Sequence, residues 1–313
     1  MPQDAPPPDS SDQVEQAVRA LMPALRRQAM GANLFIALAI GATVVGALLI
    51  LNSGMEDKDR WKMAGLAGIA GFVVVAWIYR STIRSQQAQV MPILASAIGL
   101  TYSKDAKTFL QALPKRLLPA RGIRTGEDHV HGSIGAHGIH MAEIHVESGG
   151  KNSRTLFRGI VAQFPNRATM PAFFIAQEDT TRPGFFFGGD LTTEGLFKLR
   201  TVTGGRGRSY GIWTSSISQQ EPPALSEVVA ILTRIEDLVG PAAELYAATS
   251  NGVEMHIALT HRRNLFHIGG LFPDESTLFR DVRDAMHDLT VPLTLAKALI
   301  EAEEATVAKV KGA

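Results

Sequence analysis

Histidine is concentrated in one short stretch of the chain, EDHVHGSIGAHGIHMAEIHVES, which covers residues 127–148. Five of the nine histidines in the protein fall within it. Imidazole is a common ligand of zinc and other transition metals, and it is also the side chain that most readily exchanges a proton near neutral pH. The stretch therefore raises the question of whether it binds a metal ion, forms a catalytic centre or simply builds a strand pair.

We expect this stretch to form two strands that turn at the sequence GAHG. A register that pairs Ile134 with Ile139 places His131 opposite Ala142, and His137 then lies in the turn. Because side chains alternate between the faces of a strand, and cross-strand pairs share a face, only some of the histidines can meet. The histidines that share one face are His129, His131 and His140.

These three histidines form a candidate metal site of the kind that leaves one coordination position open. His129 and His131 are two residues apart, which is about 6.6 Å along a strand, so the spacing permits it. The alternative, which the sequence favours, is a polar and partly solvated sheet face whose neutral imidazoles bond to water or backbone. Glu143 and His145 fall on the other face, and His140-x-x-Glu143-x-His145 matches no zinc-protease spacing.

A second candidate site lies in the glycine-rich sequence TGGRGRSYG, residues 203–211. Glycines allow a close backbone approach, and Arg206 and Arg208 supply positive charge for an anion or a lipid headgroup. The sequence has neither the G-x-x-x-x-G-K-[ST] pattern nor a G-x-G-x-x-G motif between a strand and a helix. A glycine-rich turn before a strand is therefore favoured, and an anion or headgroup contact is the alternative.

Several classes of function lack the residues that they need. The absence of cysteine excludes disulfides, thiolate metal sites, iron–sulfur clusters and cysteine nucleophiles. A formal net charge of +1 gives no general attraction to nucleic acid, so we expect no nucleic-acid partner. The chain has no zinc-deaminase signature, EF-hand loop or kinase motif set. The sequence GRSYG at 207–211 matches the letters G-x-S-x-G, but it leads into a predicted strand and does not join a strand to a helix, so it predicts no nucleophile elbow. No catalytic residue and no cofactor can therefore be assigned, which favours a protein that is not an enzyme.

Two uncharged runs indicate a membrane protein. The first, NLFIALAIGATVVGALLIL, covers residues 33–51 and comes close to the roughly 30 Å hydrocarbon core of a bilayer. The second, MAGLAGIAGFVVVAWIY, has Trp61, Trp77 and Tyr79 near its ends, where amphipathic rings favour the interface. A pair of buried core helices is the alternative, but two such runs joined by a short polar loop are unusual in a soluble core. We predict a transmembrane hairpin at 33–79, with spans at about 33–51 and 62–79.

The charges that flank the two spans predict their orientation. Basic residues outside the hairpin outnumber the three in its loop; they are Arg19, Arg26, Arg27, Arg80 and Arg84. The positive-inside rule therefore places both termini in the cytoplasm. Small residues four apart, such as Ala64 and Gly68, allow the spans to pack on each other, on a membrane-protein partner or on a second copy. The two uncharged runs, 33–51 and 63–79, contain no Asp, Glu, Lys, Arg or His, which argues against a transporter.

The remainder of the chain divides into segments of different composition. Residues 1–11 are a tail rich in proline, serine and aspartate that we expect to be disordered, and residues 12–32 form a juxtamembrane helix. Residues 80–313 form a soluble domain, with two subdomains at about 95–220 and 221–313. Clusters of strands and helices without βαβ alternation predict an α+β fold with a mixed, mainly antiparallel sheet.

Strands are predicted where Ile, Val, Phe and Tyr are concentrated, at 129–134, 139–147, 155–164, 171–178 and 210–217. A helical stripe between Leu225 and Leu238 is followed by the sequence ELYAATSNGVEMHIALTH, which predicts a hairpin that turns at Asn251–Gly252. Two helices then complete the chain, at roughly 274–288 and 291–310.

This arrangement resembles the domain-of-unknown-function 3137 family of uncharacterised bacterial membrane proteins. The resemblance rests on MPILASAIGLTYS, on the histidine stretch, on LFRGIVAQFP, and on the region from VVAILTRIEDLVG to NLFHIG, with the helix LTVPLTLAKALIEA after it. The positions that carry it are Gly132, Glu143, Phe157, Gly159 and Phe266. The sequence GFFFGGDLTTEGLFKLRTVTGGRGRSYG departs from the pattern. The resemblance implies a membrane-tethered α+β domain of the cell inner membrane and no established chemistry.

Two hypotheses for function follow from the sequence. The first is a membrane-anchored cytosolic module that is not an enzyme and that binds a partner protein or lipid headgroups; it rests on the two spans and on the lack of a catalytic signature. The second is a metal-dependent enzyme or a metal sensor that uses His129, His131 and His140.

Overall fold

A computed structural model describes residues 9–54, 56–135, 137–151, 153–165, 171–178, 195–215, 223–239, 243–261, 265–272 and 274–312. The chain forms two compact units. The helical unit comprises residues 1–97 and 266–286, and the sheet unit comprises residues 98–265 and 287–313. Residues 1–8 of the predicted disordered tail, residues 1–11, lie outside the described residues. The first helix begins at Asp9.

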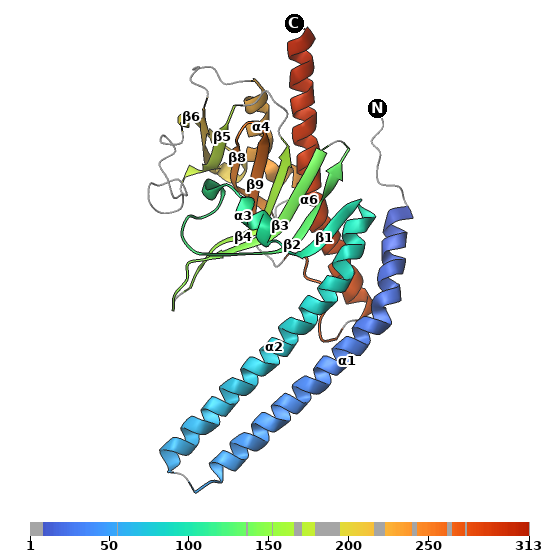
Figure 1. The fold of residues 1–313 in the computed structure, drawn as a ribbon, viewed down its shortest axis with the longest axis vertical. Helices are drawn as coiled ribbons and strands as arrows, with labels where there is room; N and C mark the ends of the chain where they lie inside the picture. The colour runs from blue at the N-terminus through green and yellow to red at the C-terminus, as the bar shows by residue number, and fades with distance from the viewer. Residues whose placement is uncertain are drawn as a thin grey trace. The chain divides into compact units, whose positions relative to one another are not determined.

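Two long helices, α1 (Asp9–Leu51) and α2 (Asp57–Ala97), dominate the helical unit and lie side by side as a hairpin (Figure 1). Each is continuous from an apolar half to a more polar half, so the predicted juxtamembrane helix and the first span form one element. In the polar halves, a stripe at helical spacing is buried and gives the pair its packing surface. Its members include Val14, Val18, Met22, Leu25, Ala29, Val90, Met91 and Leu94.

The apolar halves of α1 and α2 present their side chains outward. Among the described residues, two helices are long and apolar enough to cross a membrane, and the most apolar segment of each is entirely unburied. Phe35, Leu49 and Phe72, for example, are 64%, 69% and 74% exposed. The helices still approach closely at Gly71, because a Cβ there would lie 2.2 Å from Thr43 Oγ1. The second residue of the predicted small-residue face, Gly68, has nothing within 4 Å of its Cβ position.

The third part of the helical unit is the beginning of α6 (Glu275–Gly312) and the loop before it. Arg19 of α1 binds Glu275 at 2.9 Å, and its guanidinium lies 5.2 Å from the ring centre of Phe279. The predicted break between helices at 274–288 and 291–310 is not observed, because α6 continues through Pro292.

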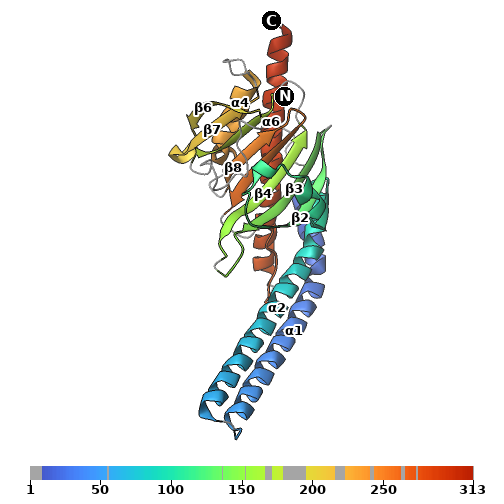
Figure 2. The same ribbon diagram turned by 60° about the vertical axis from the view of Figure 1, so that its left-hand side comes forward.

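Nine strands of the described residues form one sheet in the order β1-β2-β3-β4-β9-β8-β5-β7-β6, and every neighbouring pair is antiparallel. Figure 2 shows β2, β3 and β4 side by side with β8, β7 and β6 farther along the sheet. The strands are β1 (Leu100–Asp105), β2 (Ile123–Ile134), β3 (His137–Glu147), β4 (Thr155–Pro165), β5 (Phe173–Gln177), β6 (Phe197–Thr203), β7 (Ser209–Thr214), β8 (Ala243–Ser250) and β9 (Glu254–His261).

Short helices complete the sheet unit: α3 (Lys107–Ala112), η1 (Lys115–Leu117), η3 (Gly205–Gly207), α4 (Pro223–Thr233) and α5 (Ile235–Val239). The α+β class and the mainly antiparallel sheet are therefore confirmed. The five predicted strands correspond to β2, β3, β4, β5 and β7, and the predicted hairpin is β8–β9. The predicted subdomains 95–220 and 221–313 share this one sheet, because β9 and β8 lie between β4 and β5.

The middle of the sheet is covered on both faces. In β9, the five consecutive residues from Met255 to Leu259 are all buried, which requires a layer on each side. On one face, Phe109 of α3 and Leu117 of η1 belong to a core that also contains Phe157 of β4. On the other face, Val291 of α6 borders a small cavity with Ile160 and Leu259.

The glycine at position 159 allows two strands of this sheet to pack closely. A Cβ there would lie 1.8 Å from the carbonyl oxygen of Leu259 in β9, which is backbone and cannot move without the strand. The close approach of β9 therefore requires glycine at this position.

Candidate functional site

The three histidines predicted to share a face do come together on the β2–β3 hairpin. His131 pairs directly with His140 across the two strands. The ring centres of His129, His131 and His140 lie 4.9–5.8 Å apart with interplanar angles of 8–21°. Phe109 of α3 stacks on His129 at 5.2 Å and on His140 at 6.3 Å. We call His129, His131 and His140 the histidine stack.

The observed register differs from the predicted one by two residues. Ile134 pairs with His137 rather than with Ile139, and His131 faces His140 rather than Ala142. The turn between the strands is tighter than GAHG, since Gly135 adopts φ 58° and His137 already belongs to β3. A shift of two residues preserves the faces of a strand, so the same three histidines meet although their partners change.

Two imidazoles of the histidine stack, those of His129 and His140, have lowered pKa values. Burial, reinforced by its two histidine neighbours, lowers the pKa of His129 to about 4, and burial also lowers the pKa of His140. His129 Nε2 and His140 Nδ1 lie 3.3 Å apart, a distance that suits one N–H···N hydrogen bond. His131 Nδ1 is buried and has no hydrogen-bond partner.

A neutral imidazole with a free nitrogen is a metal ligand, but ring orientation decides whether three can bind one ion. The lone pairs of imidazole lie in the ring plane, and these rings are nearly parallel, so their nitrogens do not converge. As arranged, no group of three or more His, Cys, Asp or Glu side chains among the described residues could hold a metal ion. The metal site at His129, His131 and His140 therefore stays a prediction, and it requires at least one ring to rotate.

The opposite face of the same hairpin carries an acidic cluster that the sequence prediction missed. Glu143 of β3 is 5% exposed, and its Oε1 lies 3.5 Å from Nε of Arg158 in β4. Asp128, also buried, accepts a 2.6 Å hydrogen bond from the hydroxyl of Tyr102 in β1. Asp128 adopts φ 58° at the irregularity between Glu127 and Val130, a conformation that aspartate tolerates better than most residues.

Burial sets the protonation of this cluster. It raises the pKa of Glu143 to about 8, because Arg158 only partly offsets it while Asp128 and Glu127 add to it. Burial and the nearby Asp128 also raise the pKa of the Tyr102 hydroxyl. The hydroxyl therefore stays protonated and donates a hydrogen bond to Asp128. Glu143 is therefore mostly protonated at pH 7 and able to hold or release a proton. His145 lies on the same face but contacts Thr155 and Glu147.

The two arginines of the glycine-rich turn share one carboxylate. Arg206 lies in η3 and Arg208 just before β7, and they bind the two oxygens of Glu244 in β8 at 2.9 and 2.7 Å. The residue at 206 has φ 56° in the middle of this turn. The turn precedes a strand, as the sequence favoured, and the arginines face a protein carboxylate. Their contact with an anion or a lipid headgroup stays a prediction.

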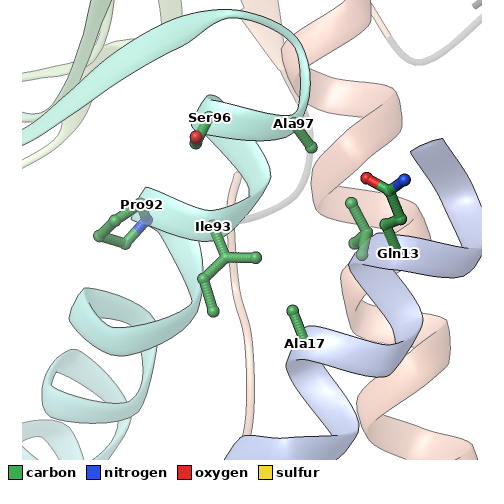
Figure 3. Close-up of a pocket in the computed structure, with 7 residues that line it drawn as sticks. Gln13, Ala17, Pro92, Ile93, Ser96 and Ala97 are labelled. Carbon is green, nitrogen blue, oxygen red and sulfur yellow. The ribbon is translucent and has the colours of Figure 1, made fainter.

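A cavity of about 550 Å³ lies in the helical unit, between the polar ends of α1 and α2. Figure 3 shows Ala17 of α1 across from Ile93 of α2, with Gln13 facing Ala97. Its lining is apolar or small apart from Gln13 and Ser96. Pro92 borders it and removes one backbone N–H from the last turns of α2. The cavity suits an apolar side chain or an acyl segment better than a charged ligand.

Comparisons with known proteins add little to this picture. No protein-family model matches the chain, and no curated protein matches its sequence. One similar solved structure is the crystal structure of the mycobacterial trehalose monomycolate transport factor A. It has a TM-score of 0.33 and 10% identity, and the match covers 66% of this chain and 95% of that chain. A likeness this low transfers no function. The resemblance to the domain-of-unknown-function 3137 family stays a proposal from the residues.

The residues that sequence reasoning missed have one feature in common. Tyr102, Asp128 and Arg158 are ordinary polar residues at irregular spacing, and only the sheet order β1-β2-β3-β4 brings them together around Glu143. The one available signal was Asp128, a polar residue just ahead of an alternating strand, since such residues often mark a bulge.

Proposed function

We propose that the chain is a membrane-anchored interaction module of the cell inner membrane, without a catalytic role. The observation that carries this proposal is the unburied apolar surface of α1 and α2. Two adjacent helices with this much outward apolar surface are unfavourable in water, because each exposed side chain such as Phe72 loses transfer free energy. A bilayer removes that penalty without any further protein.

The orientation that we propose places both termini and the sheet unit in the cytosol. Arg26, Arg27, Arg80 and Arg84 are all exposed at the polar ends of the two apolar segments, where they can contact anionic headgroups. At the other end of the hairpin, the first turns of α2 carry fewer basic residues, and two of them, Arg60 and Lys62, pair with Asp57 and Asp59. Both observations favour the cytosol for the polar ends.

The surface best suited to a partner protein is the cavity lined by Val14, Ala17 and Ile93. Ala17 is sixteen residues before Asn33, so the cavity lies about 20–25 Å along the helix from the first span. A partner that approaches it is therefore in water and not in lipid. An apolar side chain from a partner protein would fill the space, with Gln13 and Ser96 available for hydrogen bonds.

Site-specific photo-crosslinking in membranes tests the interaction role. A photoreactive phenylalanine analogue at Ile93 is expected to give a reproducible adduct with one identified protein. The same group at Val253, which is 69% exposed in the β8–β9 turn, serves as the matched control. No adduct from Ile93, or the same adducts from both positions, would count against a binding role for the cavity.

A second function, metal binding by the histidine stack, is favoured by one specific observation: His131 Nδ1 is buried and lacks a hydrogen-bond partner. His129 and His140 would complete the ligand set, and their lowered pKa values mean that protons compete weakly for these nitrogens at pH 7. A bound ion would act as a structural or sensing centre here, because no neighbouring group has been assigned a catalytic role.

Elemental analysis of the full chain after dialysis against zinc, nickel or manganese tests this second function. Stoichiometric metal is expected to be lost in the triple variant His129→Gln, His131→Gln, His140→Gln. The matched control is His145→Gln, which changes a histidine on the opposite face of the same hairpin. Sub-stoichiometric metal in the unmodified chain, or metal that survives the triple change, would remove the hypothesis.

A further inference from the structure

Backbone atoms of the loop that precedes α6, residues 267–272, form hydrogen bonds with side chains of both long helices. Asn33 Nδ2 of α1 donates to the carbonyl oxygen of Leu271 at 2.8 Å. Gln86 of α2 accepts from Gly270 N at 2.8 Å and donates to its carbonyl oxygen at 3.2 Å. Gly269 N donates to Asp281 Oδ2 of α6 at 3.2 Å. Four hydrogen bonds from three helices therefore fix the path of this loop.

Glycine is required where the loop meets α2. Gly269 has φ 89°, which favours glycine, and a Cβ at that position would lie 2.2 Å from Gln86 Oε1. Any larger residue would displace the Gln86 side chain and break its two bonds to Gly270. Gly269 is thus explained by its backbone conformation and its close approach to α2, whereas a Cβ at Gly270 would meet nothing within 4 Å.

The contacts place the loop at the end of the two apolar segments. Gln28 of α1 lies level with Ser85 and Gln89 of α2, because its side chain bonds to both. In an antiparallel pair, Asn33 is then level with about residues 80–84 of α2. Asn33 is the first residue of one uncharged run, and Tyr79 is the last of the other. The carbonyl of Leu271 therefore lies within about a helical turn of both boundaries.

The tip of this loop is apolar and exposed. Phe272 is 81% exposed, the highest value of any large apolar residue among the described positions. On α1, at the level of the loop, Met30 and Leu34 are also 71% and 61% exposed. A single exposed phenylalanine is unremarkable by itself. This one is held by a fixed backbone at the edge of a membrane-sized apolar surface.

We propose that the loop 267–272 is a third membrane contact, which seats Phe272 in the boundary between lipid headgroups and acyl chains beside the two spans. This inference rests on the proposed membrane anchoring. Aromatic and aliphatic side chains gain free energy in that boundary when the backbone presents them without further ordering. The exposed Asp274 caps the start of α6 two residues later, so the contact stays at the headgroup level.

Such a contact would do more than add affinity. The loop lies between β9, which belongs to the sheet unit, and α6. The first part of α6 belongs to the helical unit, and its remainder belongs to the sheet unit. Seating Phe272 in the bilayer would fix the level of this loop relative to the membrane surface.

Spin-label accessibility in the full chain tests the inference, and the absence of cysteine removes all background labelling. Phe272→Cys is labelled in vesicles of phosphatidylcholine with a minority of phosphatidylglycerol. Collision with oxygen, which concentrates in the bilayer, is compared with collision with a water-soluble nickel chelate. Phe72→Cys provides the lipid reference, and Val253→Cys provides the water reference, since both native residues are similarly exposed at 74% and 69%.

The label at Phe272 is expected to favour oxygen over nickel by a ratio that lies between the two references. Adding Asn33→Ala or Gly269→Ala, which loosen the loop by different contacts, is expected to move that ratio toward the Val253 value. A Phe272 ratio equal to that of Val253, with Phe72 in lipid, would overturn this inference alone. A Phe72 label that favours nickel would overturn the membrane anchoring itself.

Discussion

The apolar halves of α1 and α2 and the nine-stranded sheet use the same kinds of side chain in opposite ways. In the spans, Phe72 is 74% exposed, and the most apolar helical segments have no buried share. In the sheet unit, Phe173 and Phe174 are fully buried between layers. The uncharged runs 33–51 and 63–79 contain no Asp, Glu, Lys, Arg or His, whereas the sheet unit buries Glu143, Asp128 and His256.

The proposed membrane anchoring explains this difference, because the apolar helix halves would then face lipid while the sheet unit faces water. A side chain faces outward at no cost where the solvent is lipid, and it must be covered where the solvent is water. A buried ionisable group is tolerated in the sheet unit because it can lose its charge or find a partner. Substitutions at equivalent positions in the two units should therefore have different consequences.

The largest difference is expected between two glycines. Gly159→Ala places a Cβ 1.8 Å from the Leu259 carbonyl oxygen in the sheet, whereas Gly68→Ala in the second apolar segment meets nothing within 4 Å. The first change should lower the free energy of unfolding by about 3 kcal/mol or more. The second should leave it unchanged or raise it by up to about 1 kcal/mol. Denaturant unfolding of both variants in detergent measures the contrast, and equal effects would contradict it.

An arginine at an exposed apolar position should cost more free energy where the position faces lipid than where it faces water. Phe72→Arg in the second apolar segment should cost about 2.5–3.5 kcal/mol of membrane insertion. Val253→Arg, at a residue that is 69% exposed in the sheet unit, should cost less than about 0.5 kcal/mol of stability. The fraction of each variant that resists alkaline extraction from membranes is the measurement. An unchanged fraction for Phe72→Arg would show that this surface does not meet lipid.

A buried carboxyl in the sheet unit should make stability depend on pH. The pKa of Glu143 is raised to about 8, so the folded chain binds a proton that the unfolded chain releases between about pH 4.5 and pH 8. The stability from this group is therefore lost as pH rises, by at most about 1.4 kcal/mol per pH unit. Glu143→Gln should abolish that slope.

The window above pH 6.5 isolates Glu143 from the histidines. Burial lowers the pKa values of His129 and His256 to about 4, so their contribution to stability is lost only as pH falls below about 6.5. Unfolding at pH 6.5 and pH 8 in the unmodified chain and in Glu143→Gln measures the slope. Identical slopes in the two proteins would mean that Glu143 is ionised throughout.

The smallest effect is expected at the paired arginines. Arg206 and Arg208 share Glu244 at a partly exposed position, so each pair should contribute about 0.2–1 kcal/mol. A double-mutant cycle with Arg206→Gln and Glu244→Gln measures the coupling. Binding of anionic vesicles by the sheet unit that disappears in Arg206→Gln, with unchanged unfolding, would instead support the predicted headgroup contact.

Most of the architecture could be predicted because it depends on local patterns. The uncharged run from Asn33 to Leu51 forms the second half of α1, and the segments 155–164 and 210–217, rich in Ile, Val, Phe and Tyr, correspond to β4 and β7. The edge strands β1 and β6 were not predicted, since Leu100–Asp105 and Phe197–Thr203 are short and mostly polar or exposed. The joining of both predicted subdomains in one sheet depends on long-range pairing, which no local pattern encodes.

The candidate site could also be predicted only where it depends on local patterns. Strand alternation identified His129, His131 and His140 as one group, because a register shift of two residues leaves the faces unchanged. The stacking of their rings on Phe109 depends on how α3 crosses the sheet, and the acidic cluster around Glu143 depends on the neighbouring strands. Neither follows from spacing along the chain. The loop with Phe272 was not predicted either, since its position depends on single side chains of α1 and α2.

The most direct test of membrane spanning is single-cysteine labelling of the cysteine-free chain in intact cells. Glu56→Cys lies in the loop between α1 and α2, and Val253→Cys lies in the sheet unit. A membrane-impermeant maleimide is expected to label Glu56→Cys in intact cells, and to label Val253→Cys only after the membrane is permeabilised. Labelling of both positions from the same side would contradict a spanning hairpin, and the reverse pattern would contradict a cytosolic sheet unit.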